Sequence, residues 1–276
     1  MRVWFKVCKL TIGMPSYNNF AEVFFTVESL KLHHDLKDAE IIVIDNFGCP
    51  DIEKFAKKAE IRYEKYTDIT GVSAAKNRIF EIAKGEHVLC MDSHILLKQG
   101  CLDNLPEDDN FYQGPLIHSD CKLYNLEWLP VWRGNMFGIW DQSVKELPKE
   151  DKTILAMGAG FFYCRRDTWL GFNKHFRGFG GESGYIQEKY RQSGRKVICN
   201  MNMIWLHMFN RKPPYPLNIK DRIINYILGF WELKLDLMQI KHYFGDQLFN
   251  ECLTIARQRD PSIICRTETI KNETSI

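Results

Sequence analysis

The sequence lacks the paired cysteines that mark zinc ribbons and thioredoxin-like redox proteins. Nine cysteines are spread over the 276 residues, and no two of them stand in a Cys-x-x-Cys pair. That pairing supplies ligands to structural zinc or the two thiols of a redox site, so both classes are excluded. Cys90, Cys164 and Cys199 lie inside apolar runs, where a reduced cysteine packs as a small hydrophobic side chain.

Long apolar runs and a strong charge of one sign are missing as well. No segment approaches the roughly 20 apolar residues of a membrane span, and no secretory signal is recognisable. With the odd number of cysteines, these features predict a reducing, cytoplasmic compartment and no membrane partner. The formal net charge is only +2, which by itself predicts no nucleic-acid partner but leaves room for a local basic patch.

The stretch from His87 to Leu97 is the most informative part of the chain. Residues 88–91 have the length and apolar character of a strand buried on both faces, and Asp92-Ser93-His94 follows. Side chains two apart in an extended chain point to the same side, so Asp92 and His94 can converge on one ion. An oxygen and an imidazole nitrogen suit Mn²⁺ better than Mg²⁺. Taken alone, so short a motif is more often the ordinary start of a loop.

Strands and helices alternate over the first 98 residues. Strands are predicted over residues 10–14, 40–44, 61–63 and 88–91, and helices over residues 20–34, 51–59 and 71–84. This alternation predicts an α/β fold with a doubly wound, mostly parallel sheet. The loops after the strands then gather at one edge of the sheet, where open α/β sheets bind nucleotides.

The pattern changes after residue 98. Residues 128–140 contain three tryptophans, which predicts either a packed connection or a substrate-binding surface. A strand is predicted over residues 154–164, then a helix that follows Ser183, and an apolar segment over residues 197–206. One long helix is predicted from Asp221 to Tyr243, and its apolar stripe is more typical of core than of a partner surface.

Four motifs occur in the order found in glycosyltransferases of the GT-A fold. They are Pro15-Ser16-Tyr17-Asn18, Ile42-Val43-Ile44-Asp45-Asn46, Gly71-x-Ser73-Ala74-Ala75-Lys76-Asn77 and Asp92-x-His94. The first three resemble the broad family-2 type, in which an Asp at a strand end reads the uracil of a UDP-sugar. Asp45 occupies that place. Lys76 stands where the family usually has Arg, which keeps the charge but loses the bidentate fork.

Asp92-Ser93-His94 is also similar to the motif of the polypeptide N-acetylgalactosaminyltransferases. That likeness continues in Met157-Gly158-Ala159-Gly160-Phe161, Gly180-Gly181-Glu182-Ser183 and His207-Met208-Phe209. It implies a Mn²⁺ (or Mg²⁺) site made of Asp92, His94 and His207, with Glu182 as the catalytic residue. The nucleotide sugar is then expected to contact Pro15, Ser16, Tyr17, Asp45, Gly71, Ala75, Lys76, Asp92, Ser93, Gly181 and Arg211.

The resemblance implies a GT-A domain in two halves with a helical extension. Residues 1–98 are expected to form the nucleotide-sugar-binding half and residues 99–211 the acceptor and catalytic half. Residues 212–276 are expected to form the C-terminal helical extension. The expected activity is metal-dependent transfer of a sugar from a UDP-sugar to a hydroxyl acceptor.

Two mechanisms stay open at this stage. Inverting relatives usually have Glu-Asp with the Asp as general base, and Ser183, which takes that position here, cannot act as the base. Glu182 either deprotonates the acceptor itself, with inversion, or orients the sugar while the leaving phosphate takes the proton, with retention. We favour retention, which the acetylgalactosaminyltransferase likeness implies.

Two other classes compete with a transferase. A metal-dependent hydrolase would use the same three ligands, but the chain has no His-Glu-x-x-His motif. An inactive sugar-nucleotide-binding module would explain why Lys76 and Ser183 depart from the family pattern. Turnover of UDP-sugars, rather than binding alone, distinguishes an enzyme from such a module.

The acceptor is expected beside Trp132 and Arg133. The compact form and Val131-Trp132-Arg133-Gly134 resemble glycosyltransferases encoded by bacterial viruses, which implies an acceptor in the host cytoplasm. A hydroxymethylated base of bacteriophage DNA is one candidate, and a protein hydroxyl or a glycan is the other. DNA would require further basic residues on one face, and the candidates are Lys122, Arg165, Arg166, Lys174, Arg177, Lys189 and Arg191.

Overall fold

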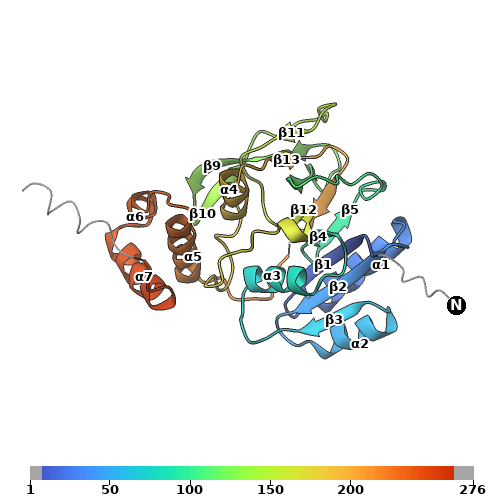
Figure 1. Ribbon diagram of the computed structural model, residues 1–276, viewed down its shortest axis with the longest axis horizontal. Coiled ribbons are helices and arrows are strands. Elements are labelled where there is room, and N and C mark those ends of the chain that lie inside the picture. Colours follow the sequence, from blue (N-terminus) through green and yellow to red (C-terminus); the bar gives the residue numbers. More distant parts are fainter. Residues whose placement is uncertain (1–7, 210, 264–276) are drawn as a thin grey trace, which may run out of the picture.

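An eight-stranded sheet forms the centre of the computed structural model, which describes residues 8–209 and 211–263 (Figure 1). Its order is β11-β13-β6-β12-β4-β1-β2-β3. Four neighbouring parallel strands come from the first half of the chain, which confirms the α/β fold. They are β1 (Leu10–Ser16), β2 (Ala39–Asp45), β3 (Arg62–Lys65) and β4 (His87–Met91).

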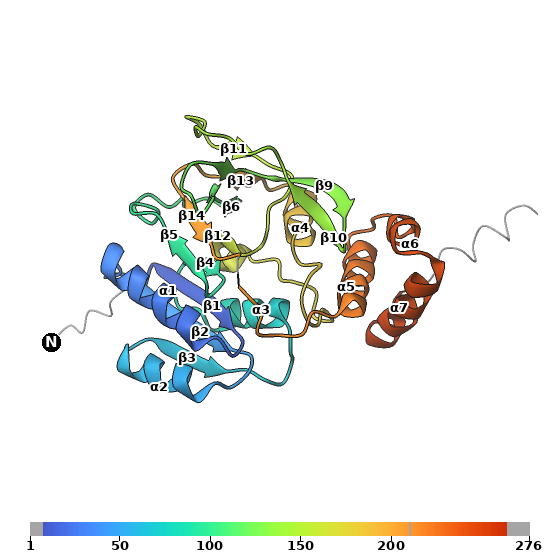
Figure 2. The same cartoon turned by 180° about the vertical axis from the view of Figure 1, so that it is seen from behind.

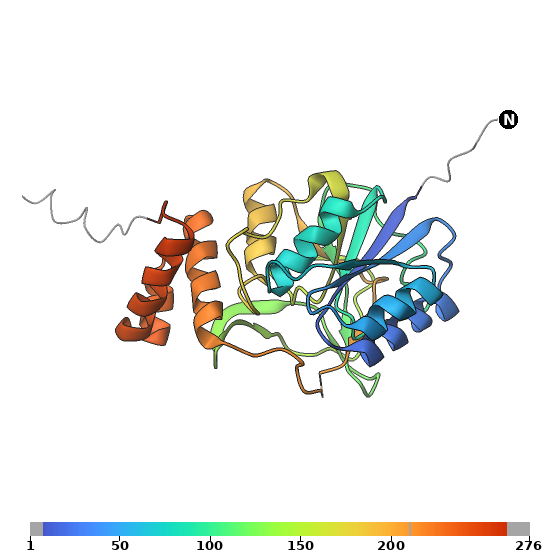
Figure 3. The same ribbon diagram turned by 90° about the horizontal axis from the view of Figure 1, so that it is seen from below.

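Helices cover both faces of these parallel strands. Helices α1 (Phe20–His33) and α2 (Pro50–Lys58) lie on one face, and α3 (Val72–Ile82) lies on the other (Figure 3). In α1 the buried positions Val23, Val27 and Leu30 recur at the helical spacing, so one stripe faces the sheet. Each crossover helix therefore returns the chain to the same edge, and the carboxyl ends of the strands lie together.

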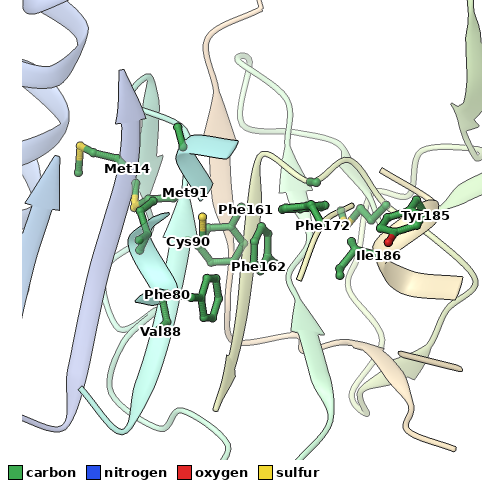
Figure 4. Close-up of a cluster of buried hydrophobic side chains, with 14 of the residues drawn as sticks. Met14, Phe80, Val88, Cys90, Met91, Phe161, Phe162, Phe172, Tyr185 and Ile186 are labelled. Carbon is green, nitrogen blue, oxygen red and sulfur yellow. The ribbon is translucent and has the colours of Figure 1, made fainter. Parts of the chain in front are cut away.

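The second half of the chain extends the same sheet. Strand β12 (Phe161–Arg165) pairs antiparallel with β4 and places Phe161 opposite Met91. Beyond β12 lie β6 (Phe111–Gln113), β13 (Val197–Cys199) and β11 (Lys152–Thr153). Buried aromatic rings fill the core at this junction: the Phe80 ring stacks on Phe162, with centroids 6.1 Å apart, among the buried side chains drawn in Figure 4.

A four-stranded sheet carries the third metal-ligand candidate. Its order is β5 (Ile95–Leu97), β14 (Trp205–His207), β7 (Leu116–Ile117) and β8 (Tyr124–Asn125). The apolar segment over residues 197–206 is not one continuous strand, because a turn at residues 200–204 divides it between two sheets. The pairing of β14 with β5 places His207 opposite Ile95, next to His94.

Residues 154–160 do not continue β12 as predicted. They approach the strand irregularly, and the Ala159 amide donates to Ser183 Oγ at 2.9 Å instead of joining a strand ladder. The Asp92 amide likewise donates to the carbonyl oxygen of Gly160 at 2.7 Å. This segment leads from β11 into the sheet and delivers three small residues to its edge.

The C-terminal region contains three helices where one was predicted. They are α5 (Ile219–Glu232), α6 (Met238–Phe244) and α7 (Asp246–Arg259). The chain turns at Lys234, which has a φ of 57°, and Asp236 Oδ1 accepts a hydrogen bond from the Met238 amide at the start of α6. The apolar pattern hid the break because Leu233, Leu235 and Leu237 all pack against the core.

Two features bear on the compartment. None of the described helices is long and apolar enough to cross a membrane. The eight described cysteines are free thiols, and six of them are buried; Cys265 lies outside the described residues.

The β-hairpin of β9 (Trp128–Arg133) and β10 (Met136–Trp140) packs against the C-terminal helices (Figure 2). Trp132 makes the largest set of aromatic contacts between them. Its ring stacks on Tyr243 with centroids 5.0 Å apart, meets Tyr226 edge-on at 5.0 Å, and lies 4.8 Å from Phe137. The expected acceptor role of Trp132 is not supported, because these rings already cover its faces.

We expect Trp132→Ala to lower the free energy of unfolding by about 2–3 kcal/mol, somewhat less than for a fully buried tryptophan, because the ring is half-buried. Denaturant unfolding followed by circular dichroism measures this loss. Val131→Ala, at the neighbouring exposed position, is the matched control and should change stability little. A Trp132→Ala protein as stable as the wild type would contradict the packing role.

Candidate active site

A cavity of about 540 Å³ lies beside the end of β4. Its walls come from the loop after β4, the segment before β12, the β9–β10 hairpin, the loop before α4 (Tyr185–Gln192) and residues 205–215. The site residues predicted from the sequence that line this cavity are Lys76, Asp92, His94, Arg133, Gly181, Glu182, His207 and Arg211.

Three ligand atoms converge in the cavity wall. The Nε2 atoms of His94 and His207 are 3.0 Å apart, and they lie 3.9 and 3.8 Å from Asp92 Oδ2. An ion held by bonds of about 2.0–2.2 Å places neighbouring ligand atoms about 3 Å apart or slightly more. Among the described residues, Asp92, His94 and His207 form a group that could hold a metal ion.

Gly160 leaves room for an ion at this point. A Cβ atom there would lie 3.0 Å from Asp92 Oδ2 and 3.7 Å from the His207 ring. Any larger residue would fill the space in front of the ligand atoms. The donor set of one carboxylate and two imidazoles, together with this space, fits a divalent transition metal such as Mn²⁺.

Lys76 holds Asp92 in place. Its Nζ lies 2.9 Å from Asp92 Oδ1 and donates to the carbonyl oxygen of Ala159 at 2.5 Å, and the side chain is almost fully buried. Although Lys76 borders the cavity as predicted, both of these contacts are to the protein itself. A direct contact with a donor phosphate would require Lys76 to release Asp92, so the structure gives it a positioning role.

The electrostatic surroundings of Asp92 and His207 favour the protonation states in which these side chains bind a metal ion. Burial raises the pKa of Asp92, but the nearby Lys76 ammonium and the two histidines outweigh it and hold that pKa well below its ordinary value. Burial lowers the pKa of His207. At neutral pH the site therefore presents an ionised carboxylate and a neutral His207 imidazole, the forms that bind metals.

Helix α1 supports the loop that carries the ligands. Thr26 Oγ1 donates to the carbonyl oxygen of Ser93 at 2.9 Å, and Asn19 Nδ2 donates to Ser93 Oγ at 2.7 Å. Arg211 lies between helix and ligand, 3.3 Å from Glu22 Oε1 and 3.0 Å from His94 Nε2. Arg211 thus lies at the cavity as predicted, although in this structure it contacts protein groups.

Glu182 is buried with one oxygen unpartnered. The side chain is 6% exposed, Oε2 has no hydrogen-bond partner in the protein, and the residue lines the cavity. Burial raises the pKa of Glu182, and the Lys76 ammonium offsets part of that rise. An unpartnered carboxylate oxygen in a cavity wall is costly for the fold and available to a ligand.

The loop that carries Glu182 packs directly on α5. Gly180 and Gly181 have φ values of 100° and 93°, and Cβ atoms on them would lie 2.4 Å from Arg222 and 2.7 Å from Asn225. Asn225 Nδ2 donates to the carbonyl oxygen of Gly180 at 2.7 Å. The sequence pattern missed Asn225 and the cavity-lining Tyr226, because both lie in a helix whose periodicity indicated only core packing.

Asp45 lies at the predicted strand end but faces its own loop. It is fully buried, and its oxygens accept hydrogen bonds from the backbone amides of Phe47, Gly48 and Cys49 and from Tyr63 Oη, at 2.5–3.0 Å. A uracil N3–H would have to displace one of these four donors. In this structure Asp45 therefore shapes the loop, and direct base reading is not supported.

The remaining predicted donor residues lie behind the cavity wall. Ser16, Ala75 and Ser93 are buried, and Gly71, with a φ of 154°, lies so close to Gly178 that a Cβ atom would be 2.9 Å from its amide nitrogen. Tyr17 lies 6.1 Å, ring centre to ring centre, from the cavity-lining Tyr215. Their contact with a nucleotide stays a prediction, as it does for Pro15.

The hairpin supplies the cavity wall opposite the metal-ligand group. Trp128, Arg133 and Trp140 line the cavity, whereas Trp132 points into the aromatic cluster with the C-terminal helices. The Trp128 indole nitrogen is buried without a partner. Cβ atoms on Gly138 and Gly158 would lie 2.3 and 3.0 Å from the indole ring, so both glycines make room for it.

The basic residues considered for a DNA acceptor do not gather at this cavity. None of the seven lines it. Arg165 pairs with Asp109 and Asp167, Lys189 with Glu232, and Arg191 with Glu188. Strand pairing places Arg165 opposite His87, at the far end of β4 from Asp92.

Comparison with known families now identifies the chain. The model of glycosyl transferase family 2 matches residues 11–169, more than half of the chain. The chain belongs to glycosyl transferase family 2. The match contains β1, Lys76 and the Asp92–His94 loop, and it ends before Glu182 and His207. No match was found among curated proteins.

Solved glycosyltransferases share the GT-A fold with this family member. The structure of GalNAc-T7 with UDP, GalNAc and Mn²⁺ is 16% identical, with a TM-score of 0.67 over 92% of this chain and 54% of that one. The mannosyltransferase PcManGT from Pyrobaculum calidifontis, in complex with GDP-Man and Mn²⁺, is 11% identical, with a TM-score of 0.54 over 95% and 78%. TarS residues 1–349 from S. aureus are 14% identical, with a TM-score of 0.50 over 97% and 76%.

We expect the purified protein to bind Mn²⁺. Each of three substitutions should weaken that binding by at least about tenfold, because each removes one of the three ligands: Asp92→Ala, His94→Ala and His207→Ala. Electron paramagnetic resonance of free Mn²⁺ measures the affinity. The exposed His33→Ala is the matched control. Unchanged affinity in any of the three site variants would remove that residue from the site.

Proposed function

We propose that this chain transfers a sugar from a UDP-sugar to a hydroxyl acceptor with retention at the anomeric carbon. The observation that carries the proposal is the convergence of the Asp92–His94–His207 group and the unpartnered Glu182 carboxylate in one cavity of a family 2 domain. Related structures hold UDP or GDP-Man with Mn²⁺. The chain spans only about half of GalNAc-T7, so its donor and acceptor are proposals.

The metal site would serve the leaving group. Asp92, His94 and His207 would hold Mn²⁺, which supplies positive charge to the diphosphate as the glycosidic bond breaks. Lys76 keeps Asp92 ionised and oriented through its contact at 2.9 Å. Arg211 lies close enough to turn from Glu22 and His94 towards a bound phosphate, which a guanidinium binds through two parallel hydrogen bonds.

Glu182 would contact the transferred sugar. In the retaining mechanism its unpartnered Oε2 accepts a hydrogen bond from a hydroxyl group of the transferred sugar and so orients the sugar ring. The leaving phosphate takes the proton from the hydroxyl group of the acceptor. Ser183 cannot remove that proton, because a hydroxyl group is too weak a base. Its Oγ also accepts a hydrogen bond from the Ala159 amide at 2.9 Å. The second candidate is an inverting transferase with Glu182 as general base, which the raised pKa of Glu182 favours.

The acceptor would bind along the β9–β10 hairpin. Trp128, Trp140 and Arg133 line the cavity there, and Met136 adds an apolar surface that is 36% exposed. Indole rings stack on sugar rings and apolar groups, and Arg133 can bind a polar one. A protein or glycan hydroxyl suits this wall better than DNA, since the seven basic residues considered for DNA lie elsewhere on the described surface.

We expect Glu182→Gln to lower kcat by on the order of a hundredfold or more if Glu182 is the base, with UDP affinity little changed, because the amide keeps the shape but cannot take a proton. Radiolabelled UDP-sugars, Mn²⁺ and protein, glycan or hydroxymethylated-DNA acceptors give the rate. Binding of UDP-sugars without turnover on every acceptor would favour the inactive module.

Proton NMR of the new linkage then separates the mechanisms. Retention rules out Glu182 as an inverting base, and inversion overturns the retaining proposal. Transfer that proceeds undiminished in Glu182→Gln would remove Glu182 from both mechanisms. Glu188→Gln, three residues after Tyr185 and engaged with Arg191, is the control for general effects on this region.

We expect Asp45→Asn to weaken UDP binding through the loop rather than through lost base contact. Asp45 Oδ2 now accepts hydrogen bonds from the Cys49 amide and the Tyr63 hydroxyl. An Asn amide group in that position would place its own N–H donors against these two donors. Isothermal titration with UDP and CDP tests this. The loop role predicts that affinity falls for both nucleotides by a similar factor; selective loss for UDP would restore direct base reading.

A further inference from the structure

The two ring nitrogens of His94 lie in different surroundings. Nε2 faces the cavity, 3.0 Å from His207 Nε2 and 3.0 Å from a terminal nitrogen of Arg211. Nδ1 faces the other way, towards α1, where Glu22 Oε2 lies 3.5 Å from it. The histidine therefore sits between a metal-binding position and a carboxylate.

The contact with Arg211 indicates which nitrogen carries the proton. A guanidinium donates hydrogen bonds and has no lone pair to offer, so His94 Nε2 must accept. In a neutral imidazole the proton is then on Nδ1, the nitrogen that lies 3.5 Å from Glu22 Oε2. A metal ligand needs its lone pair on the nitrogen that faces the ion, and this is the state that His94 already has.

Glu22 is held for this contact. Its Oε2 accepts a hydrogen bond from Asn19 Nδ2 at 2.7 Å, and its Oε1 lies 3.3 Å from Arg211. Asn19, Glu22 and Thr26 follow at helical spacing, so one face of α1 supports the whole Asp92–His94 loop.

His207 has no such support. Nδ1 of each histidine is buried and makes no hydrogen bond of normal geometry, but His94 Nδ1 lies 3.5 Å from Glu22 Oε2, whereas the carboxylate contact of His207 is through Nε2, to Asp92 at 3.8 Å. Of the two histidines, His94 is therefore the one whose ring orientation and tautomer are set from behind by a carboxylate. Carboxylates in that position commonly orient metal-binding histidines and raise their basicity.

We infer that Glu22 is a positioning residue of the metal site, which holds the Nδ1 proton of His94 and thereby turns the Nε2 lone pair towards the ion. In the metal-free protein Arg211 donates a hydrogen bond to that lone pair, and a bound ion would replace Arg211 there. This inference rests on the proposed metal site and adds a residue that the family motifs do not include.

We expect Glu22→Leu to weaken Mn²⁺ binding by about 10–100-fold, the usual effect of losing such a partner. Glu22→Gln should weaken it less, because the amide oxygen can still accept the Nδ1 proton. Glu28→Gln, a partly buried glutamate on the same helix, is the matched control and should bind Mn²⁺ as the wild type does. Paramagnetic resonance of free Mn²⁺ measures all three without any turnover.

A variant of Arg211 separates Glu22 from its neighbour. If Glu22 acted only by holding Arg211, Arg211→Leu would weaken Mn²⁺ binding as much as Glu22→Leu does, and the inference would be overturned. The inference predicts equal or tighter Mn²⁺ binding by Arg211→Leu, because a cation that shares His94 Nε2 has been removed.

Nitrogen NMR of the metal-free protein tests the tautomer directly. We expect the His94 signals, assigned by their loss in His94→Gln, to show the proton on Nδ1 in the wild type, a shift towards Nε2 in Glu22→Leu, and a smaller shift in Glu22→Gln. A proton on Nε2 in the wild type would overturn the inference even if Glu22→Leu fails to fold. Absence of Mn²⁺ binding by the wild type contradicts the metal site itself, whereas normal binding by Glu22→Leu contradicts only the role of Glu22.

Discussion

A buried ion pair between Lys76 and Asp92 connects the layers of this protein at its functional edge. Lys76 comes from α3, Asp92 from the end of β4, and the same ammonium binds the Ala159 carbonyl from the segment before β12. A buried lysine is costly unless it is paired and hydrogen-bonded, and here both conditions are met. The pair therefore fixes Asp92 Oδ1 and leaves Oδ2 facing the two histidines, so the candidate metal site depends on an ion pair within the protein.

The polar residues at the strand ends divide into two groups with different roles. At the end of β2, the side chains of Asp45 and Asn46 form hydrogen bonds within the protein. Asp45 accepts four of them, and Asn46 donates to the carbonyl oxygens of Tyr66 and Ile69. At the end of β4, Asp92 and His94 instead face the cavity. The first group shapes the loops that follow β2, and the second presents possible ligand atoms to the cavity.

The C-terminal helices belong to the site as much as to the scaffold. Helix α5 contacts the Gly180–Gly181 backbone so closely that only glycine fits, and Asn225 holds that backbone by a hydrogen bond. The same helix contributes Tyr226 to the cavity and to the cluster around Trp132. Residues 212–263 thus hold both the Glu182 loop and the β9–β10 hairpin, which a purely peripheral extension would not do.

The sequence by itself determined the α/β fold and the convergence of Asp92 with His94, because strand periodicity and a two-residue spacing are local properties of an extended chain. The glycosyltransferase family followed from the resemblance of short motifs, which are local as well. The structure alone decided that Lys76 holds Asp92, that Asp45 faces its own loop, and that Trp132 packs on Tyr243. It also decided that Glu22 stands behind His94. These roles depend on which distant segments of the chain meet in the fold. Packing between helices and strands decides which atoms of each side chain are already in contact with the protein and which face the cavity, and no local sequence pattern encodes that packing.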